Sequence, residues 1–305
     1  MSSAATPAAA IPPRAIVLVI VLTLVWGTNW PLFPLAVREI SVWTFRAVSV
    51  TMAGAFLLLI AHLRGQSLAI PRRAWPILVL AASSYLVVWN IASTFSAVLI
   101  PSGQSAVLGF TMPLWAALLA WMVLGQALTR RQVVAVVLGV ISVGLLMVPG
   151  LGAYADAPLG FGLGLLAGFG WAVGTLILKR LPATVPPLVL TGWQLLIAAV
   201  PLTVAAFWLA EGPWFMPTTQ SLVVIVYIAL IPMSVGNAAW FTIAGLLPAN
   251  VAGLSSVMVP VVAMISGAIV HSEPLGPLQL LAMACSMLAL SLVLLKPRQA
   301  KAANA

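Results

Sequence analysis

The stretch NIASTFSAVLIPSGQSAVLGFTMP, which runs from Asn90 to Pro113, decides the fold because the chain repeats its pattern. Among the residues that recur 147 positions later are Asn90 as Asn237, Pro101 as Pro248, and Pro113 as Pro260. Two prolines and an asparagine keep this spacing without a gap, which composition alone does not produce. We therefore interpret the chain as an internal duplication.

The composition indicates a membrane protein. Of the 305 residues, 63% are hydrophobic and only 6% are charged, and the mean hydropathy is +1.18. A water-soluble domain of this length does not need so much apolar sequence. The net charge of +9 does not indicate nucleic-acid binding, because the thirteen basic residues are scattered between apolar runs. We expect an all-α integral membrane protein that contacts the lipid bilayer and a small-molecule substrate, and no nucleic acid.

Apolar windows bounded by charge, proline or glycine predict ten transmembrane helices. Their approximate limits are 15–35, 42–63, 75–98, 102–124, 131–149, 158–178, 188–210, 220–244, 249–271 and 276–295. Residues 1–14 are small, polar or proline-bearing, and we expect them to form a disordered lead. A cleaved signal peptide is the alternative, but its apolar part should span only about 7 to 15 residues, and this run continues from Val17 to Leu35.

The distribution of charge predicts the orientation in the membrane. With the N-terminus in the cytoplasm, eleven of the thirteen Lys and Arg residues fall in cytoplasmic segments, and only Arg38 and Arg46 fall on the opposite side. The four acidic residues also lie on that opposite side: Glu39, Asp156, Glu211 and Glu273. Basic residues in short loops mark the cytoplasmic face. We expect a bacterial-type plasma (inner) membrane protein with both termini in the cytoplasm and residues 296–305 as a cytoplasmic tail.

The duplication and the span count together predict inverted repeats. Each copy, 15–149 and 158–295, contains five spans, and an odd number makes the second copy enter the membrane in the opposite sense. Transporters of this design hold the substrate near the midplane, where the two halves meet. The turn at Pro101 would then face the outside, and its copy at Pro248 would face the cytoplasm.

Several motifs resemble those of a known family, the EamA-type ten-helix exporters of the drug/metabolite transporter superfamily. The motifs are Val25-Trp26-Gly27-Thr28-Asn29-Trp30, the pair Phe45-Arg46, the segment from Pro113 to Leu128, and the segment from Pro260 to Leu275. Gln126 departs from the pattern, because the family usually has the glutamate that the second copy has at Glu273. More narrowly, the sequence is similar to the bacterial aromatic amino acid exporters. This resemblance implies a cavity walled mainly by the third, fourth, eighth and ninth helices.

Polar and aromatic side chains concentrate in the spans 75–98 and 220–244, which the repeat relates to each other. A polar group inside hydrocarbon should face the protein interior or a wet cavity. With two residues of the first span, the candidate substrate-binding residues are Asn29, Trp30, Tyr85, Trp89, Asn90, Thr94, Tyr227, Ser234, Asn237, Trp240 and Phe241. Their rings would stack on an aromatic substrate, and Asn and Ser would bind its amino and carboxylate ends. The alternative is structural, because Asn and Ser also tie membrane helices together.

Four prolines and one arginine are candidate hinge or gate residues: Pro101, Pro113, Pro248, Pro260 and Arg46. A proline inside a span removes a backbone donor, so Pro113 and Pro260 predict bends at the centres of 102–124 and 249–271, although neighbouring groups can also satisfy such a kink. Arg46 lies about one turn inside its span. It either extends to the outer surface, attracts a substrate carboxylate, or pairs with Glu39 or Glu273 as an outer gate.

Signatures of enzymes are missing from the sequence. The two histidines, four acidic residues and single cysteine are far apart, which leaves no metal cluster or catalytic set, and there is no GxxxxGK[ST] phosphate loop. We therefore expect no enzyme activity, no metal, no cofactor and no ATPase subunit. The sequence leaves the oligomeric state open.

Together these observations predict a secondary transporter that exports small amphipathic metabolites, in the first place aromatic and other neutral amino acids, by alternating access. The alternative is a broad-specificity efflux transporter for drugs or dyes, which should carry a membrane-embedded carboxylate for cations. A channel or an oligomeric scaffold is the alternative outside transport. Because no Asp, Glu or His lies in the middle of a span, we also expect gradient-driven efflux with little proton coupling.

Overall fold

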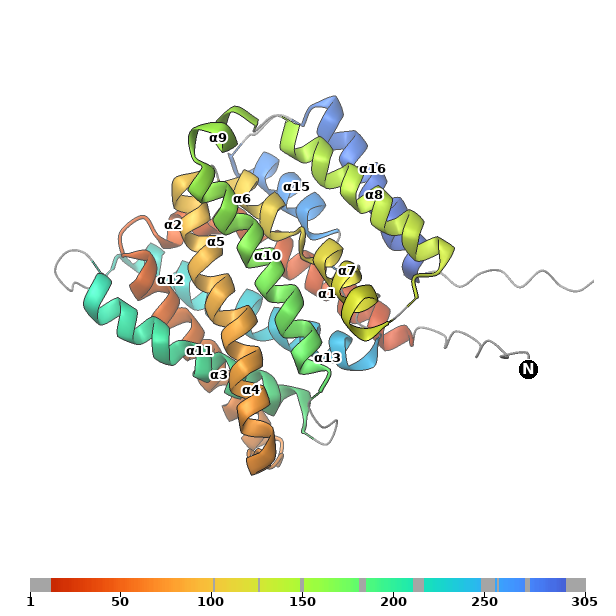
Figure 1. Ribbon diagram of the computed structural model, residues 1–305. Helices are drawn as coiled ribbons and strands as arrows, with labels where there is room; N and C mark the ends of the chain where they lie inside the picture. The colour runs from red at the N-terminus through yellow and green to blue at the C-terminus, as the bar shows by residue number, and fades with distance from the viewer. Residues whose placement is uncertain are drawn as a thin grey trace, which may run out of the picture.

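The computed structural model describes residues 12–100, 102–125, 127–148, 151–180, 185–210, 217–247, 256, 258–271 and 275–294, and every regular element in them is helical (Figure 1). The first half contains α1 (Pro13–Gly27), η1 (Trp30–Leu32), α2 (Phe33–Ala36), α3 (Val42–Leu63), η2 (Arg72–Ala74), α4 (Trp75–Ala82), η3 (Ser83–Val87), α5 (Val88–Leu99), α6 (Ser102–Gly109), α7 (Met112–Leu124) and α8 (Arg130–Met147). The second half contains α9 (Leu151–Asp156), α10 (Pro158–Leu178), α11 (Pro187–Leu209), α12 (Thr219–Ile228), η5 (Ala229–Gly236), α13 (Asn237–Leu246), α15 (Val259–His271) and α16 (Pro277–Leu294).

Seven helical segments are long and apolar enough to cross a bilayer. They are Pro13–Leu32, Val42–Leu63, Arg72–Ser96, Ser105–Leu124, Pro158–Leu178, Pro187–Leu209 and Thr219–Leu246. Two shorter apolar helices cover Val259–Val270 and Pro277–Ala289. Large apolar side chains on the outer surface, such as Trp208 at 83% exposure and Phe207 at 71%, suit contact with lipid. The prediction of an all-α integral membrane protein is confirmed, whereas the count of ten spans stays a prediction.

Each half packs its first long helix against the other half. Helix α1, the first of its half, packs on η5, α13 and α15 of the other half, and α10, the first long helix of the second half, packs on η3, α5, α6 and α7. Like helices also pair, because α3 lies along α11, and α8 lies beside α16 at the edge of the molecule (Figure 1). This arrangement buries the middle of the third span of each half, where polar residues concentrate.

Small residues allow the central helices to approach closely. A Cβ atom added to Gly54 of α3 would lie 2.9 Å from the side chain of Leu196, and one added to Gly192 of α11 would lie 2.7 Å from that of Leu58. Inside a bilayer the hydrophobic effect does not drive helices together. Close van der Waals packing of this kind therefore holds membrane helices in contact.

Both third spans are interrupted at matching positions. A π-helical turn covers Ser83–Val87 in the first half and Ala229–Gly236 in the second, and a shift of 147 residues places the first segment within the second, at 230–234. A π-turn inserts an extra residue into the helix, so some backbone carbonyls lose their usual partner and side chains are re-aimed. Each interruption lies at a contact between the halves, because η3 packs on α10 and η5 packs on α1.

Two of the candidate hinge prolines, Pro113 and Pro260, lie in the first turn of a helix. The fourth span breaks at Phe110 and Thr111, and Pro113 is the second residue of α7. Pro260 is likewise the second residue of α15. Proline fits the first turn of a helix without cost because the N–H that it lacks has no partner there. The predicted mid-span bend therefore exists in the first copy as a helix break just before the proline.

Candidate functional site

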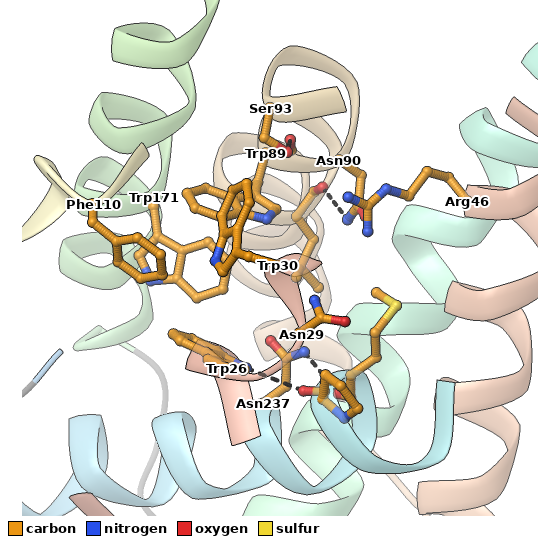
Figure 2. Close-up of a pocket in the computed structure, with 13 residues that line it drawn as sticks. Trp26, Asn29, Trp30, Arg46, Trp89, Asn90, Ser93, Phe110, Trp171 and Asn237 are labelled. Carbon is orange, nitrogen blue, oxygen red and sulfur yellow. Dashed lines mark hydrogen bonds between the residues drawn. The ribbon is translucent and has the colours of Figure 1, made fainter. Parts of the chain in front are cut away.

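A cavity lies between the two halves, at the level of the helix interruptions (Figure 2). Its lining comes from α1, η1, α3, η3, α5, the α6–α7 break, α10, η5 and α13. The lining residues are Trp26, Asn29, Trp30, Arg46, Leu86, Trp89, Asn90, Ser93, Phe110, Trp171, Pro232, Met233 and Asn237. The cavity leaves only about 60 Å³ of room for water. That space holds a few water molecules, so a larger ligand requires side chains to move.

Two asparagines occupy equivalent places in the two halves. The Asn90 Nδ2 donates to the backbone carbonyl of Leu86, and the Asn237 Nδ2 donates to that of Met233, each over 2.7 Å. Both donor–acceptor pairs are four residues apart, and both side chains are buried. Because a carbonyl can only accept, the bond fixes which end of each amide is the nitrogen. The duplicated asparagines thus keep the same local geometry.

The oxygen ends of these amides are the free ends. The side-chain oxygens of Asn90, Asn237 and Asn29 are all buried and have no hydrogen-bond partner among the residues that the structure describes. Figure 2 shows the three amides gathered beside the cavity. Leaving a buried acceptor without a donor costs about 1–3 kcal/mol. Three such acceptors around one cavity form a set that a ligand with several N–H donors would satisfy.

Arg46 brings a positive charge to the same cavity. Its side chain is only 7% exposed, and its Nε donates to the Oγ1 of Thr94 over 3.0 Å. The structure therefore places the guanidinium inside the bundle and not at the outer surface. The hydrogen bond to Thr94 orients it there. A guanidinium in a place shielded from water is a strong binding group for a carboxylate.

Aromatic rings cover the other side of the cavity, as Figure 2 shows. The ring centroids of Trp89 and Trp171 are 4.9 Å apart and nearly perpendicular, and Phe110 lies 5.8 Å from Trp30 and 6.3 Å from Trp89. Edge-to-face contacts at these distances are the favoured geometry for aromatic pairs. The cavity is therefore polarised, with rings on one side and amides and a guanidinium on the other.

Trp26 joins the two halves at the floor of the cavity. Its Nε1 donates to the backbone carbonyl of Pro232 over 3.1 Å. A Cβ atom on Gly236 would lie 2.3 Å from that Nε1, so only glycine leaves room for the indole. Its ring also packs against Trp171 at 5.2 Å and Trp240 at 5.8 Å.

The predicted site residues divide into two groups. The structure brings Asn29, Trp30, Trp89, Asn90, Asn237 and Arg46 together at the cavity. The others lie behind its wall or away from it: Tyr85, Thr94, Tyr227, Ser234, Trp240 and Phe241. Tyr85, Trp240 and Phe241 are at most 4% exposed and extend the aromatic cluster, and Tyr85 lies 5.2 Å from Phe241. Ser234 donates to the carbonyl of Ala229 in its own helix over 2.7 Å, and its hydroxyl lies 3.5 Å from the carbonyl of Ala53 in α3, which is the kind of interhelical contact that the structural alternative describes.

Of the candidate hinges, Pro101 and Pro248 lie outside the described residues. The prediction did not include Trp26 or Trp171, although both line the cavity. Trp26 was visible only as part of a motif, and Trp171 carries no signal that separates it from other tryptophans in apolar sequence.

No group of three or more His, Cys, Asp or Glu side chains that could hold a metal ion occurs within the part of the chain that the structure describes. The expectation that metal and cofactor are not involved stays a prediction.

Two helical halves that exchange their first long helices around a polar and aromatic cavity define a membrane transporter. A family model confirms this class and narrows it, because the EamA-like transporter family matches residues 13–148 and 158–295. The chain belongs to this family, and the resemblance predicted from its motifs is confirmed.

Known relatives agree with the class. The uncharacterized transporter YvbV of Bacillus subtilis is 24% identical over 95% of this chain and 94% of its own length. The uncharacterized inner membrane transporter YedA of Escherichia coli is 26% identical over 90% of this chain and 88% of its own length. A protein of Salmonella typhimurium named a probable amino-acid metabolite efflux pump is 31% identical, over 56% of this chain and 58% of its own length.

A solved crystal structure supports the fold. It matches with a TM-score of 0.75 at 18% sequence identity and covers 92% of this chain and 96% of the other. At this identity, the likeness shows the arrangement of helices and nothing about the substrate.

Proposed function

We propose that this transporter exports aromatic and other neutral amino acids from the cytoplasm by alternating access around the cavity. The observation that supports it most directly is the polarised lining, in which Arg46 and three unpaired amide oxygens stand opposite a group of aromatic rings. The name of the Salmonella typhimurium relative, a probable amino-acid metabolite efflux pump, agrees with this substrate class.

The lining matches the chemistry of an amino acid group by group. An ammonium has three N–H donors and no acceptor, which complements the oxygens of Asn29, Asn90 and Asn237. A carboxylate complements the guanidinium of Arg46. Rings of Trp30 and Trp89 would bind an aromatic side chain by edge-to-face or stacked contact.

The present size of the cavity supports a moving mechanism. About 60 Å³ of room for water is too small for a phenyl or indole ring, so side chains must separate before such a ring can enter the site. Binding would separate the side chains, pair the three amide oxygens and recover the free energy that their burial costs. Such coupling between substrate and cavity shape is what alternating access requires.

The direct test is counterflow in proteoliposomes. Vesicles loaded with unlabelled phenylalanine, tyrosine, tryptophan or threonine should accumulate the labelled amino acid transiently, with saturable initial rates. Asn237→Ala should reduce the rate by about tenfold or more, because a lost hydrogen bond to a charged group is worth about 1.5–3 kcal/mol. Unsaturable flux that ignores this substitution would indicate a channel.

A broad drug or dye exporter is the second candidate function. It should bind lipophilic cations, for which membrane-embedded carboxylates are the usual partner. None of the thirteen lining residues is acidic, and Arg46 would repel a cation. Exchange of a lipophilic cation without exchange of any amino acid in the same vesicles would favour this candidate.

A further inference from the structure

Trp89 and Gly109 form a pair that the repeat does not preserve. The residue 147 positions after Trp89 is Gly236, and the one 147 positions after Gly109 is Ser256. In the second half, Gly236 leaves the space into which Trp26 docks. In the first half, the tryptophan belongs to the third span itself and rests on the glycine of α6. Both tryptophans come from the first half, and each rests on one glycine: Trp26 on Gly236 of the second half, and Trp89 on Gly109 of its own half.

Trp26 and Trp89 differ in how their rings are held. The indole of Trp26 is fixed by its hydrogen bond to the carbonyl of Pro232. The indole N–H of Trp89 makes no hydrogen bond in the described part of the chain, and its ring is only partly buried. Packing alone therefore sets the position of Trp89, and the cavity lies along its side.

Gly109 limits how far Trp89 can retreat. A Cβ atom on Gly109 would lie 3.0 Å from the Cη2 and 3.3 Å from the Cζ3 of Trp89, closer than ordinary van der Waals contact. Trp171 packs against the ring at 4.9 Å on another side. A methyl group at position 109 would therefore displace the indole toward the cavity, where the only free room is about 60 Å³.

We propose that Trp89 sets the size of the largest substrate ring that the cavity accepts. Gly109 contributes to this limit because its missing side chain leaves room for the indole of Trp89 to lie away from the cavity. The inference rests on the proposed function and deepens it, because it identifies the specificity-determining wall of the aromatic side. Large substrates such as tryptophan depend on the retreat of Trp89, whereas threonine fits without it.

The test compares tryptophan with threonine as competitors of labelled phenylalanine in counterflow. Gly109→Ala should raise the half-inhibitory concentration of tryptophan relative to threonine by about tenfold or more, the discrimination typical of a small steric change in a pocket. Gly162→Ala is the matched control, because a Cβ atom at this exposed helical glycine meets nothing within 4 Å. Gly109 lacks a positive φ, so alanine fits its backbone.

The double variant Gly109→Ala with Trp89→Phe separates the proposed contact from general damage. A smaller ring at position 89 should restore the tryptophan-to-threonine ratio to within about threefold of wild type, since the effects of contacting residues are not additive. An equal loss for both competitors in Gly109→Ala, or a defect that persists in the double variant, would overturn the proposal.

A binding experiment keeps the inference separate from the proposed function. If wild-type protein exchanges no amino acid, the proposed function fails, and thermal shift measurements with free indole and free phenol then decide the role of Trp89. Gly109→Ala should lose stabilisation by indole while it keeps that by phenol. The same response to both rings in wild type and variant would reject the size limit.

Discussion

At the scale of single residues, Asn90 and Asn237 contribute equivalent side chains from the two halves to the lining of the cavity. Asn90 and Asn237 stand out because a polar amide recurs at one spacing in apolar sequence. Both reach the cavity with the same hydrogen bond to their own helix. Trp26 and Trp171 each lie thirteen residues after the start of a segment that matches the family, at 13 and 158, yet a tryptophan in a membrane helix is too common to indicate a site.

The tether between Trp26 and Pro232 should contribute measurably to stability. Trp26→Phe removes the N–H that bonds the carbonyl, and we expect a loss of about 1 kcal/mol in the free energy of unfolding. Trp171→Phe is the matched control, because its Nε1 has no hydrogen-bond partner to lose in the described structure. Thermal unfolding in detergent should show a larger decrease for Trp26→Phe. Equal decreases would mean that the hydrogen bond adds nothing beyond the packing of the indole.

At the scale of elements, the ends of helices carry the polar contacts that connect the halves on either surface. Glu39, which follows α2, accepts hydrogen bonds from the backbone N–H of Thr218 at 2.9 Å and from its hydroxyl at 2.8 Å, at the start of α12. These bonds lower the pKa of Glu39, because they stabilise its charged form. At the other surface, the Lys179 amine after α10 donates to the carbonyls of Ala244 and Leu247 at the end of α13.

The contact of Lys179 predicts a dependence of stability on pH. Burial lowers the pKa of Lys179 from 10.5 to about 8, because the charged amine loses hydration. The folded protein then binds fewer protons than the unfolded chain between these values. Stability from this group is fully present above pH 10.5 and is lost as the pH falls through 8. Arg180 follows Lys179, and α13 carries no titratable side chain that would offset the effect.

Melting temperatures measured from pH 7 to 10 should therefore rise for wild type relative to Lys179→Met, which lacks the titrating amine. Arg180→Gln is the control, and it should follow the wild-type profile. Parallel profiles for wild type and Lys179→Met would show that the amine is solvated and that the helix ends are held by other contacts.

At the scale of the whole molecule, the reciprocal exchange of first helices explains why one cavity collects residues from both halves. Helix α1 carries Trp26 to the second half, Asn29 and Trp30 follow directly after α1, and α10 carries Trp171 to the first half. Figure 1 shows α10 crossing the face of the first half. Neither half alone could surround a ligand. We therefore propose that the units 15–149 and 158–295 are repeats in the sequence and do not fold as independent domains.

The predicted orientation can be checked with single cysteines in a Cys285→Ala background. Ser67→Cys lies between α3 and η2, on the proposed cytoplasmic side, and Gln220→Cys lies near the start of α12, on the proposed outer side. Both positions are exposed and uncharged, so neither change alters the charge bias. A membrane-impermeant maleimide should label Gln220→Cys in intact cells and Ser67→Cys only after permeabilisation. The reverse pattern would place both termini outside.

The sequence by itself determined that the chain lies in a lipid bilayer, that it contains a repeat, and where its helices approximately begin and end. Hydropathy, charge and spacing can all be read directly from the order of the residues. The sequence also identified six residues at the cavity. Only the tertiary structure decided that Trp26 docks against Gly236, that Trp171 closes the aromatic side and that Arg46 turns inward to Thr94. Those contacts join residues up to 210 positions apart (26 to 236), and their geometry depends on how α1 and α10 cross the opposite half. Local pattern contains no information about such a crossing, since helices of the same hydropathy pack in many ways.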